Sequence, residues 1–424
     1  MPVGGAVAGD YCPLGSMARK ERQQILPDSS VFAVTQDGPT ETNGKESGVG
    51  RSGVRSVVEK ARLVLHVPKV GVPQGRDIGV DALRGFAILL VVLGHSISNA
   101  ENLYRATKYD SLYYLSNFVY TFHMPLFMLI GGYVLFGKRI RVWDRAVRLL
   151  LPFFAWIPVN WFVNRYIHHF PWSVKFLPTL KQTVLEPGLG LWFLPTLFLC
   201  SMLLIPVLHL EKWRSWTGDL TLALFFISLN LIPYDKLGLM QVKYFFFYFA
   251  VGYLAAKYRP RIKQLRKERV DTAFFAFSIV FLALFTILYY YGRIDPYAFP
   301  FSLSNLLKTP AAYFIRYLMG LLGIVFSVAL IRSLKTGHAR TAFAWFGLVT
   351  MEIYVSHGLM LQLTFGGTWL KVLVSMVTGV VLPLALAFLV LRPWWLTAVI
   401  FLGIEPARRT PPVKQPPIHQ KADT

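Results

Sequence analysis

The chain is short of charged residues and of cysteine. Only 16% of its 424 residues are charged, whereas soluble domains carry about a quarter, so the composition excludes an ordinary soluble protein. Its two cysteines stand far apart, Cys12 in a polar tail and Cys200 inside an apolar run, so we predict neither a disulfide framework nor a metal site. Residues 1–75 lack an apolar run of signal-peptide length, and the first apolar run beyond them is expected to act as an uncleaved insertion signal.

Acidic residues are scarce as well. The 22 Asp and Glu stand against 44 Lys and Arg, which gives a formal net charge of +22. An excess of this size can indicate nucleic-acid binding. Here the basic residues lie in short clusters between apolar runs rather than on one polar domain. We therefore predict no nucleic-acid partner and relate the charge to the orientation of the chain in a membrane.

Long apolar runs are what the sequence has in abundance, with 54% of the residues hydrophobic. Runs of roughly twenty residues recur, which is the length that crosses a ~30 Å hydrocarbon core. The sequence thus predicts an all-α, polytopic integral membrane bundle of about ten transmembrane helices surrounded by lipid. The expected spans are 82–99, 115–136, 146–166, 190–210, 217–233, 240–257, 272–291, 312–332, 342–364 and 370–391, with a short interfacial piece at 394–403.

Basic residues alternate between the loops. The loops after the second, fourth, sixth and eighth spans are rich in Lys and Arg, and the loops between them hold only scattered ones. By the positive-inside rule, this pattern predicts an even number of spans, both termini in the cytoplasm, and insertion in the cell (inner or plasma) membrane. We expect three regions: a disordered basic cytoplasmic tail at 1–76, a membrane domain at 77–403 and a short cytoplasmic tail at 404–424.

The first expected span carries two ionisable groups on one face. Arg84 and His95 are eleven residues apart, close to three full turns, so they lie in line along the helix about 16 Å from each other. Asp81 precedes Arg84 by one turn and can pair with it. Ionisable groups inside a membrane are costly and are usually functional. The alternative for His95 is a hydrogen bond to a neighbouring helix.

Two further histidines fall within expected spans. Counted along their helices, His95, His123 and His357 all lie about 20 Å from the cytoplasmic face. This agreement predicts one shared polar site. The alternative for His123 and His357 is a role in helix packing or in lining a pore. Glu352 is also inside a span, and we expect it to be paired or to line the site.

A basic stripe opens the third expected span. Arg141, Arg145 and Arg148 recur at helical spacing and should lie at the same height as Arg84. Together they are suited to hold the phosphates of a polyanionic ligand, because guanidinium groups bind phosphate through two parallel hydrogen bonds. The alternative is a stripe that sets topology and contacts lipid headgroups.

The stretch DALRGFAILLVVLGH resembles the opening helix of the membrane-bound acyltransferase family 3, whose signature is an Arg, ten residues and a His. Here Arg84 and His95 stand at those positions. FHMPLFMLIGGY resembles the family's second-helix motif, with Gly131 where a Ser often stands. RLLLPFFAW, GLWFLPTLF and MEIYVSHGLM resemble three later motifs in the same order. The resemblance covers about 77–391, and the form FHMP with LVVLGH is most similar to the fucose 4-O-acetylase-like, polysaccharide O-acetyltransferase branch.

The resemblance implies transfer of an acyl group, usually acetyl, from cytoplasmic acetyl-CoA to a hydroxyl of a cell-envelope or exopolysaccharide sugar, or of its lipid-linked precursor, with no metal. It implies catalytic roles for His95 and Arg84. Asp81, His123, Arg145, Arg148, Trp192, Glu352 and His357 are the expected binding residues for acyl-CoA and acceptor.

Two alternatives stay open on the sequence. Intramembrane charges also suit a transporter or flippase of a lipid-linked glycan. Such a protein would more naturally show repeated halves, and no clear internal repeat is visible. An acyltransferase acting on a lipid or a small molecule is the second alternative.

Overall fold

The computed structural model describes residues 76–99, 111–166, 175–234, 236–264, 267–292, 308–334, 337–361 and 368–404. The tails predicted at 1–76 and 404–424 lie outside these ranges except for Arg76 and Ile404. All regular elements in the described ranges are helices, in agreement with the predicted all-α bundle. Their bounds are α2 Ile78–Asn99, α3 Ser111–Tyr133, α4 Val142–Tyr166, α5 Phe176–Leu185, η3 Pro187–Leu189, α6 Phe193–Glu211, α7 Ser215–Leu231, α8 Leu239–Lys257, α9 Arg259–Lys263, α10 Lys267–Tyr290, α12 Pro310–Ser333, α13 His338–Leu348, α14 Thr350–Met360, α15 Thr368–Leu386, η4 Ala387–Leu391 and α16 Trp395–Leu402.

Every predicted span falls on a described helix. In the part of the chain that the structure describes, seven helices are long and apolar enough to cross a membrane: α2, α4, α6, α8, α10, α12 and α15 continued by η4. The protein is therefore a multi-pass membrane protein. The other three predicted spans lie on α3, which carries several polar side chains such as Asn117 and His123, on α7, which has 17 residues, and on a broken pair of helices.

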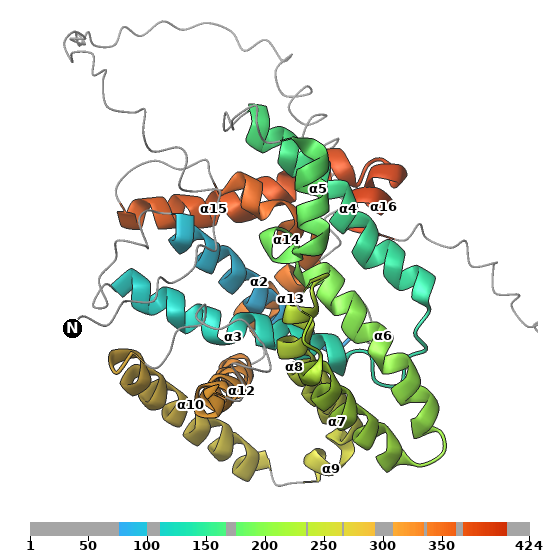
Figure 1. Cartoon of the computed structure of the whole chain (residues 1–424). Coiled ribbons are helices and arrows are strands. Elements are labelled where there is room, and N and C mark those ends of the chain that lie inside the picture. Colours follow the sequence, from blue (N-terminus) through green and yellow to red (C-terminus); the bar gives the residue numbers. More distant parts are fainter. Residues whose placement is uncertain are drawn as a thin grey trace, which may run out of the picture. The chain divides into compact units, whose positions relative to one another are not determined.

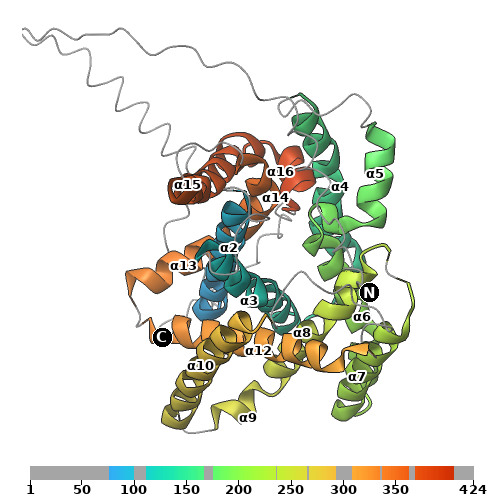
Figure 2. The same ribbon diagram turned by 60° about the vertical axis from the view of Figure 1, so that its left-hand side comes forward.

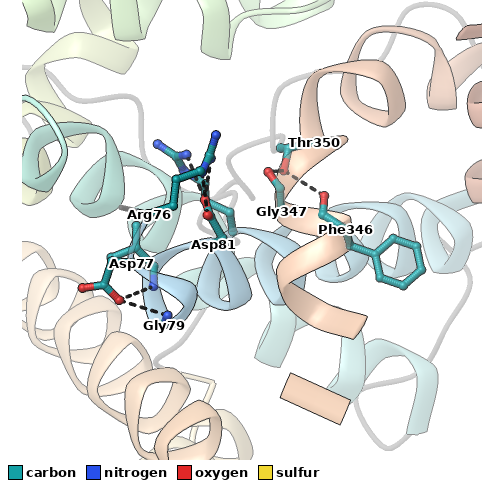
Figure 3. Close-up of polar contacts among 9 residues, drawn as sticks. Arg76, Asp77, Gly79, Asp81, Phe346, Gly347 and Thr350 are labelled. Atoms are coloured by element: carbon teal, nitrogen blue, oxygen red, sulfur yellow. Dashed lines mark hydrogen bonds and ion pairs between the residues drawn. The ribbon is translucent and has the colours of Figure 1, made fainter. Parts of the chain in front are cut away.

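The run predicted as one span at 342–364 is two helices, α13 and α14, which meet at Val349. Val349 leaves helical geometry with φ −105° and ψ 21°. The Thr350 hydroxyl donates to the carbonyls of Phe346 (3.2 Å) and Gly347 (3.0 Å), which helps to satisfy the end of α13 (Figure 3). Because apolar character continues through the break, hydropathy could not detect it.

Helices α2 and α3 lie in the middle of the described bundle, with α10 and α12 on one side and α13, α14 and α15 on another (Figures 1 and 2). Helix α13 packs closely against α2, and α8 packs closely against α3; both contacts are made at glycine residues. A Cβ on Gly85 of α2 would lie 1.7 Å from the Phe343 carbonyl oxygen of α13. A Cβ on Gly132 of α3 would lie 1.9 Å from the Phe249 carbonyl oxygen of α8. Small residues allow backbones in a membrane to come this close.

Many polar side chains inside the helices bond to their own helix. The hydroxyls of Thr121, Thr196, Ser201 and Ser327 each donate to the carbonyl four residues earlier, at 2.6–2.8 Å. A side chain satisfied in this way is tolerated in an apolar environment. The polar groups that form contacts between helices are therefore the informative ones, and those of α2 and α3 include the residues predicted from the sequence.

Candidate active site

The first group of charged residues surrounds the start of α2. The buried carboxylate of Asp81 accepts hydrogen bonds from Arg76 Nε (2.8 Å) and Nη2 (2.7 Å), and Arg84 Nη1 lies 3.5 Å from its Oδ1 (Figure 3). The expected contact between Asp81 and Arg84 is thus present. Asp77 accepts from the Gly79 amide at 3.0 Å and pairs with Arg259 Nη2 at 2.9 Å. One buried carboxylate therefore holds two guanidinium groups in place.

These residues line a cavity of about 810 Å³. Its wall is formed by the start of α2, the end of α3, the loop 137–141, the start of α4 and the region after α8, with Leu197 of α6. Three acidic side chains line it, and all three pair with arginines of the same wall. The basic side chains of the wall are Arg76, Arg84, Lys138, Arg139, Arg141, Arg145, Arg148 and Arg259.

The positive charge of this wall acts on Lys138, which lies in the loop between α3 and α4. Partial burial lowers the pKa of Lys138, and repulsion by Arg84, Arg145, Arg148 and Arg76 lowers it further. Four guanidinium groups that all act on one ammonium group form a concentrated positive field. Such a field is relieved by a ligand carrying several negative charges, and phosphate groups fit the guanidinium fork.

The three histidines of α2, α3 and α14 are brought together further along the bundle. The ring centroids of His95 and His357 are 5.2 Å apart. Tyr120 lies between His95 and the third histidine, His123. The centroid of its ring is 6.1 Å from that of His95 and 4.9 Å from that of His123, and its hydroxyl oxygen is 3.5 Å from His95 Nδ1. His123 and His357 are buried, whereas His95 is exposed.

The backbone determines which nitrogen of two of these rings carries a proton. His123 Nδ1 lies 2.8 Å from the Val119 carbonyl oxygen and His357 Nδ1 lies 2.7 Å from the Tyr354 carbonyl oxygen. A carbonyl can only accept, so each Nδ1 must donate its proton. Each Nε2 is then left with a lone pair that can accept a hydrogen bond from a hydroxyl.

The cavity and the histidines are separate along α2 and α3. The cavity ends inside the bundle at Arg84, Gly131, Leu149 and Leu197, and none of the histidines lines it. Between the cavity and the histidines, α2 and α3 carry buried apolar residues: Ala87, Ile88, Val91, Met124, Phe127 and Met128. The arrangement therefore consists of a basic cavity, an apolar layer and a group of histidines in line along one helix. It suits a long ligand with an anionic end and a neutral reactive end.

Comparison with known proteins identifies the family of this chain. The family model described as an acyltransferase domain matches residues 77–400. The chain belongs to this acyltransferase family. The resemblance seen in the sequence is thereby confirmed.

The chain is also similar to two curated proteins, both called nodulation protein NolL. It is 31% identical over 189 residues to the protein of Sinorhizobium fredii, an alignment covering 43% of this chain and 49% of that one. It is 30% identical over 198 residues to the protein of Mesorhizobium japonicum, covering 43% and 48%. The chain spans about half the length of these relatives. No solved structure matches it.

Besides His123 and His357, two other residues expected to bind ligand in this acyltransferase, Glu352 and Trp192, lie outside the cavity wall. Glu352 of α14 is buried and forms an ion pair with Arg392, which follows η4. Trp192, at the start of α6, stacks on Phe245 with ring centroids 4.9 Å apart. Sequence spacing could not identify either contact, because the partners are 40 and 53 positions away.

Sequence reasoning also missed several residues of the site. Arg76, Lys138, Arg139 and Arg259 join the cavity wall from outside the spans, where a basic residue is ordinarily assigned to topology. Tyr120 carried no signal beyond its place three residues before His123. Within the described ranges, no three His, Cys, Asp or Glu side chains are arranged to hold a metal ion.

Proposed function

We propose that this protein is a membrane O-acyltransferase that moves an acetyl group from cytoplasmic acetyl-CoA to a hydroxyl of a cell-envelope or exopolysaccharide sugar. Membership of the acyltransferase family supports the reaction class. The observation that carries the proposal is the order of groups along α2, with Arg84 in the basic cavity and His95 among the histidines. They are about 16 Å apart, on the order of the length of a pantetheine arm.

In this proposal the cavity holds the donor by its phosphates. Arg84, Arg145 and Arg148 bind them from the walls of α2 and α4. Asp81 holds Arg84 and Arg76 in place without meeting the ligand itself, because its carboxylate already accepts from both. The basic end of the bundle faces the cytoplasm in the cell membrane, where both termini would also lie and where acyl-CoA is made.

His95 is the general base. Its imidazole removes the proton of the acceptor hydroxyl while the oxygen attacks the thioester carbonyl carbon. The carbon–sulfur bond then breaks, and the imidazolium returns the proton to the sulfur of the leaving CoA. His123 and His357 each offer an Nε2 lone pair that can hold acceptor hydroxyls in position.

The test is the amount of ester-linked acetate on extracted envelope glycans, measured by NMR and mass spectrometry. A deletion strain is compared with complements carrying the wild-type protein or His95→Ala at equal levels. Acetate that disappears on deletion, returns with the wild type and stays absent with His95→Ala supports the proposal and names the acceptor. Unchanged acetate with less surface glycan would favour the transporter instead. An unchanged glycan in every respect would overturn the sugar acceptor.

Arg84→Ala is expected to raise the KM for acetyl-CoA about 10- to 150-fold, because the change removes a charge-assisted contact worth about 1.5–3 kcal/mol. The KM is measured with purified protein in detergent or nanodiscs. Arg332→Ala is the matched control, since this arginine pairs with Asp271 and does not line the cavity. An Arg84→Ala protein with the wild-type KM would exclude Arg84 from the donor site.

A further inference from the structure

The cavity has two chemically different parts. Its basic residues come from α2, α4, the loop 137–141 and Arg259. At the inner end Arg84 of α2 is the charged side chain, and it faces a wall of three uncharged residues: Gly131 of α3, Leu149 of α4 and Leu197 of α6. Phosphates gain nothing from this uncharged wall, because an unpaired charge in an apolar environment is costly. A neutral, slender part of a ligand fits there.

Gly131 borders the inner end of the cavity without a side chain. A Cβ on Gly131 would lie 2.8 Å from Leu197 Cδ1 and 3.7 Å from Phe249 Cδ2. The only close contact is thus the tip of a flexible side chain. The next residue differs, since a Cβ on Gly132 would meet the Phe249 backbone at 1.9 Å. Gly132 is needed for helix packing, whereas Gly131 is not needed for it and borders the cavity.

Gly131 lies on the same helix as His123, one of the three histidines. It lies eight residues from His123 along α3, or about 12 Å. The buried side chains between them on α3 are apolar and include Met124, Phe127 and Met128. Methionine side chains adapt easily to a ligand because they are unbranched and flexible. A neutral chain passing Gly131 would therefore meet an apolar and adaptable layer before it reaches the histidines.

We propose that the inner end of the cavity is a binding subsite for the neutral pantetheine arm of the donor, and that Gly131 opposite Leu197 sets its width. The inference rests on the proposed function, since it assumes an acyl-CoA donor whose phosphates stay at the basic wall. The subsite admits the slender thioester arm and excludes the phosphates. Gly131 is thus a specificity-determining residue that acts through the absence of a side chain.

The test compares two ligands on purified protein by calorimetry. Adenosine 3′,5′-bisphosphate carries phosphates and no arm, and acetyl-CoA carries both. Gly131→Val is expected to weaken acetyl-CoA binding at least tenfold and to change binding of the bisphosphate less than twofold. Equal weakening of both ligands, or no weakening of acetyl-CoA, would overturn the proposal.

A second pair of variants tests the proposal if the Gly131→Val protein folds poorly. Gly131→Ala places a methyl group against Leu197, and Leu197→Ala removes the side chain it meets. The double variant is expected to recover acetyl-CoA affinity to within threefold of the wild type, whereas Gly131→Ala with Leu199→Ala should not, because Leu199 lies outside the cavity wall. Equal recovery by both pairs, or by neither, contradicts the inference. A wild-type protein that binds neither ligand would instead refute the proposed function itself.

Discussion

Replacing His95 with alanine is expected to lower the rate of acetyl transfer by about 10²- to 10⁴-fold, the usual contribution of a general base. Donor affinity should stay within twofold of the wild type, because the cavity proposed to hold the phosphates ends about three turns away along α2. The measurement is the rate of CoA release that depends on acceptor, at saturating acetyl-CoA, together with donor binding by calorimetry.

His209→Ala is the control for this change. His209 lies near the end of α6 and is exposed, and its ring Nδ1 lies 3.3 Å from the Ile205 carbonyl oxygen of its own helix. Its loss should leave the rate within twofold of the wild type. A His95→Ala protein that keeps more than one tenth of the wild-type rate would show that another group accepts the proton, and His357, whose ring centroid is 5.2 Å away, would then be the next residue to replace.

Gly85→Ala is expected to destabilise the protein by about 1–3 kcal/mol, the cost of forcing one extra methyl group into a packed region. The added Cβ would lie 1.7 Å from the Phe343 carbonyl oxygen, so α2 and α13 must move apart. The same crossing is tight from the other side, where a Cβ on Gly347 would lie 1.9 Å from the Asp81 carbonyl oxygen. Because Gly85 follows Arg84, the displacement should also weaken donor binding.

The loss of stability is measured by thermal unfolding in one detergent at one protein concentration. Gly358→Ala is the matched control, because a Cβ there has no atom within 4 Å and α14 keeps its helical geometry. Its melting temperature should equal that of the wild type or exceed it slightly, since alanine favours a helix. Equal melting temperatures for Gly85→Ala and the wild type would mean that the crossing of α2 and α13 is looser than these distances indicate.

Much of the helical architecture could be predicted because its causes are local. A run of about twenty apolar residues forms a helix in a bilayer whatever surrounds it, since its backbone must satisfy its own hydrogen bonds. The ten predicted runs accordingly fall on helices. The single predicted run at 342–364 was wrong as one helix, because Thr350 and the close contact at Gly347 interrupt it without changing its hydropathy.

The spacing of Arg84 and His95 was also determined by the sequence, because both residues lie on one helix whose rise and turn are constant. The proximity of His95 to His357 was only suggested, since depth along two separate helices does not say whether they are neighbours. Tertiary structure decided it by packing α14 against α2. It also placed Tyr120 between two of the rings.

The cavity depended most on tertiary structure. Even the nearest two of Arg76, Lys138 and Arg259 are more than sixty positions apart in the sequence, and no periodicity connects them. They meet because the start of α2 and the ends of α3 and α8 lie on the same side of the bundle, where glycines such as Gly85 and Gly132 allow close packing. The sequence by itself therefore determined the membrane class and the line of groups along α2. Only the packed structure decided which other residues complete the basic wall and the histidine group, because contacts between helices depend on how their surfaces fit.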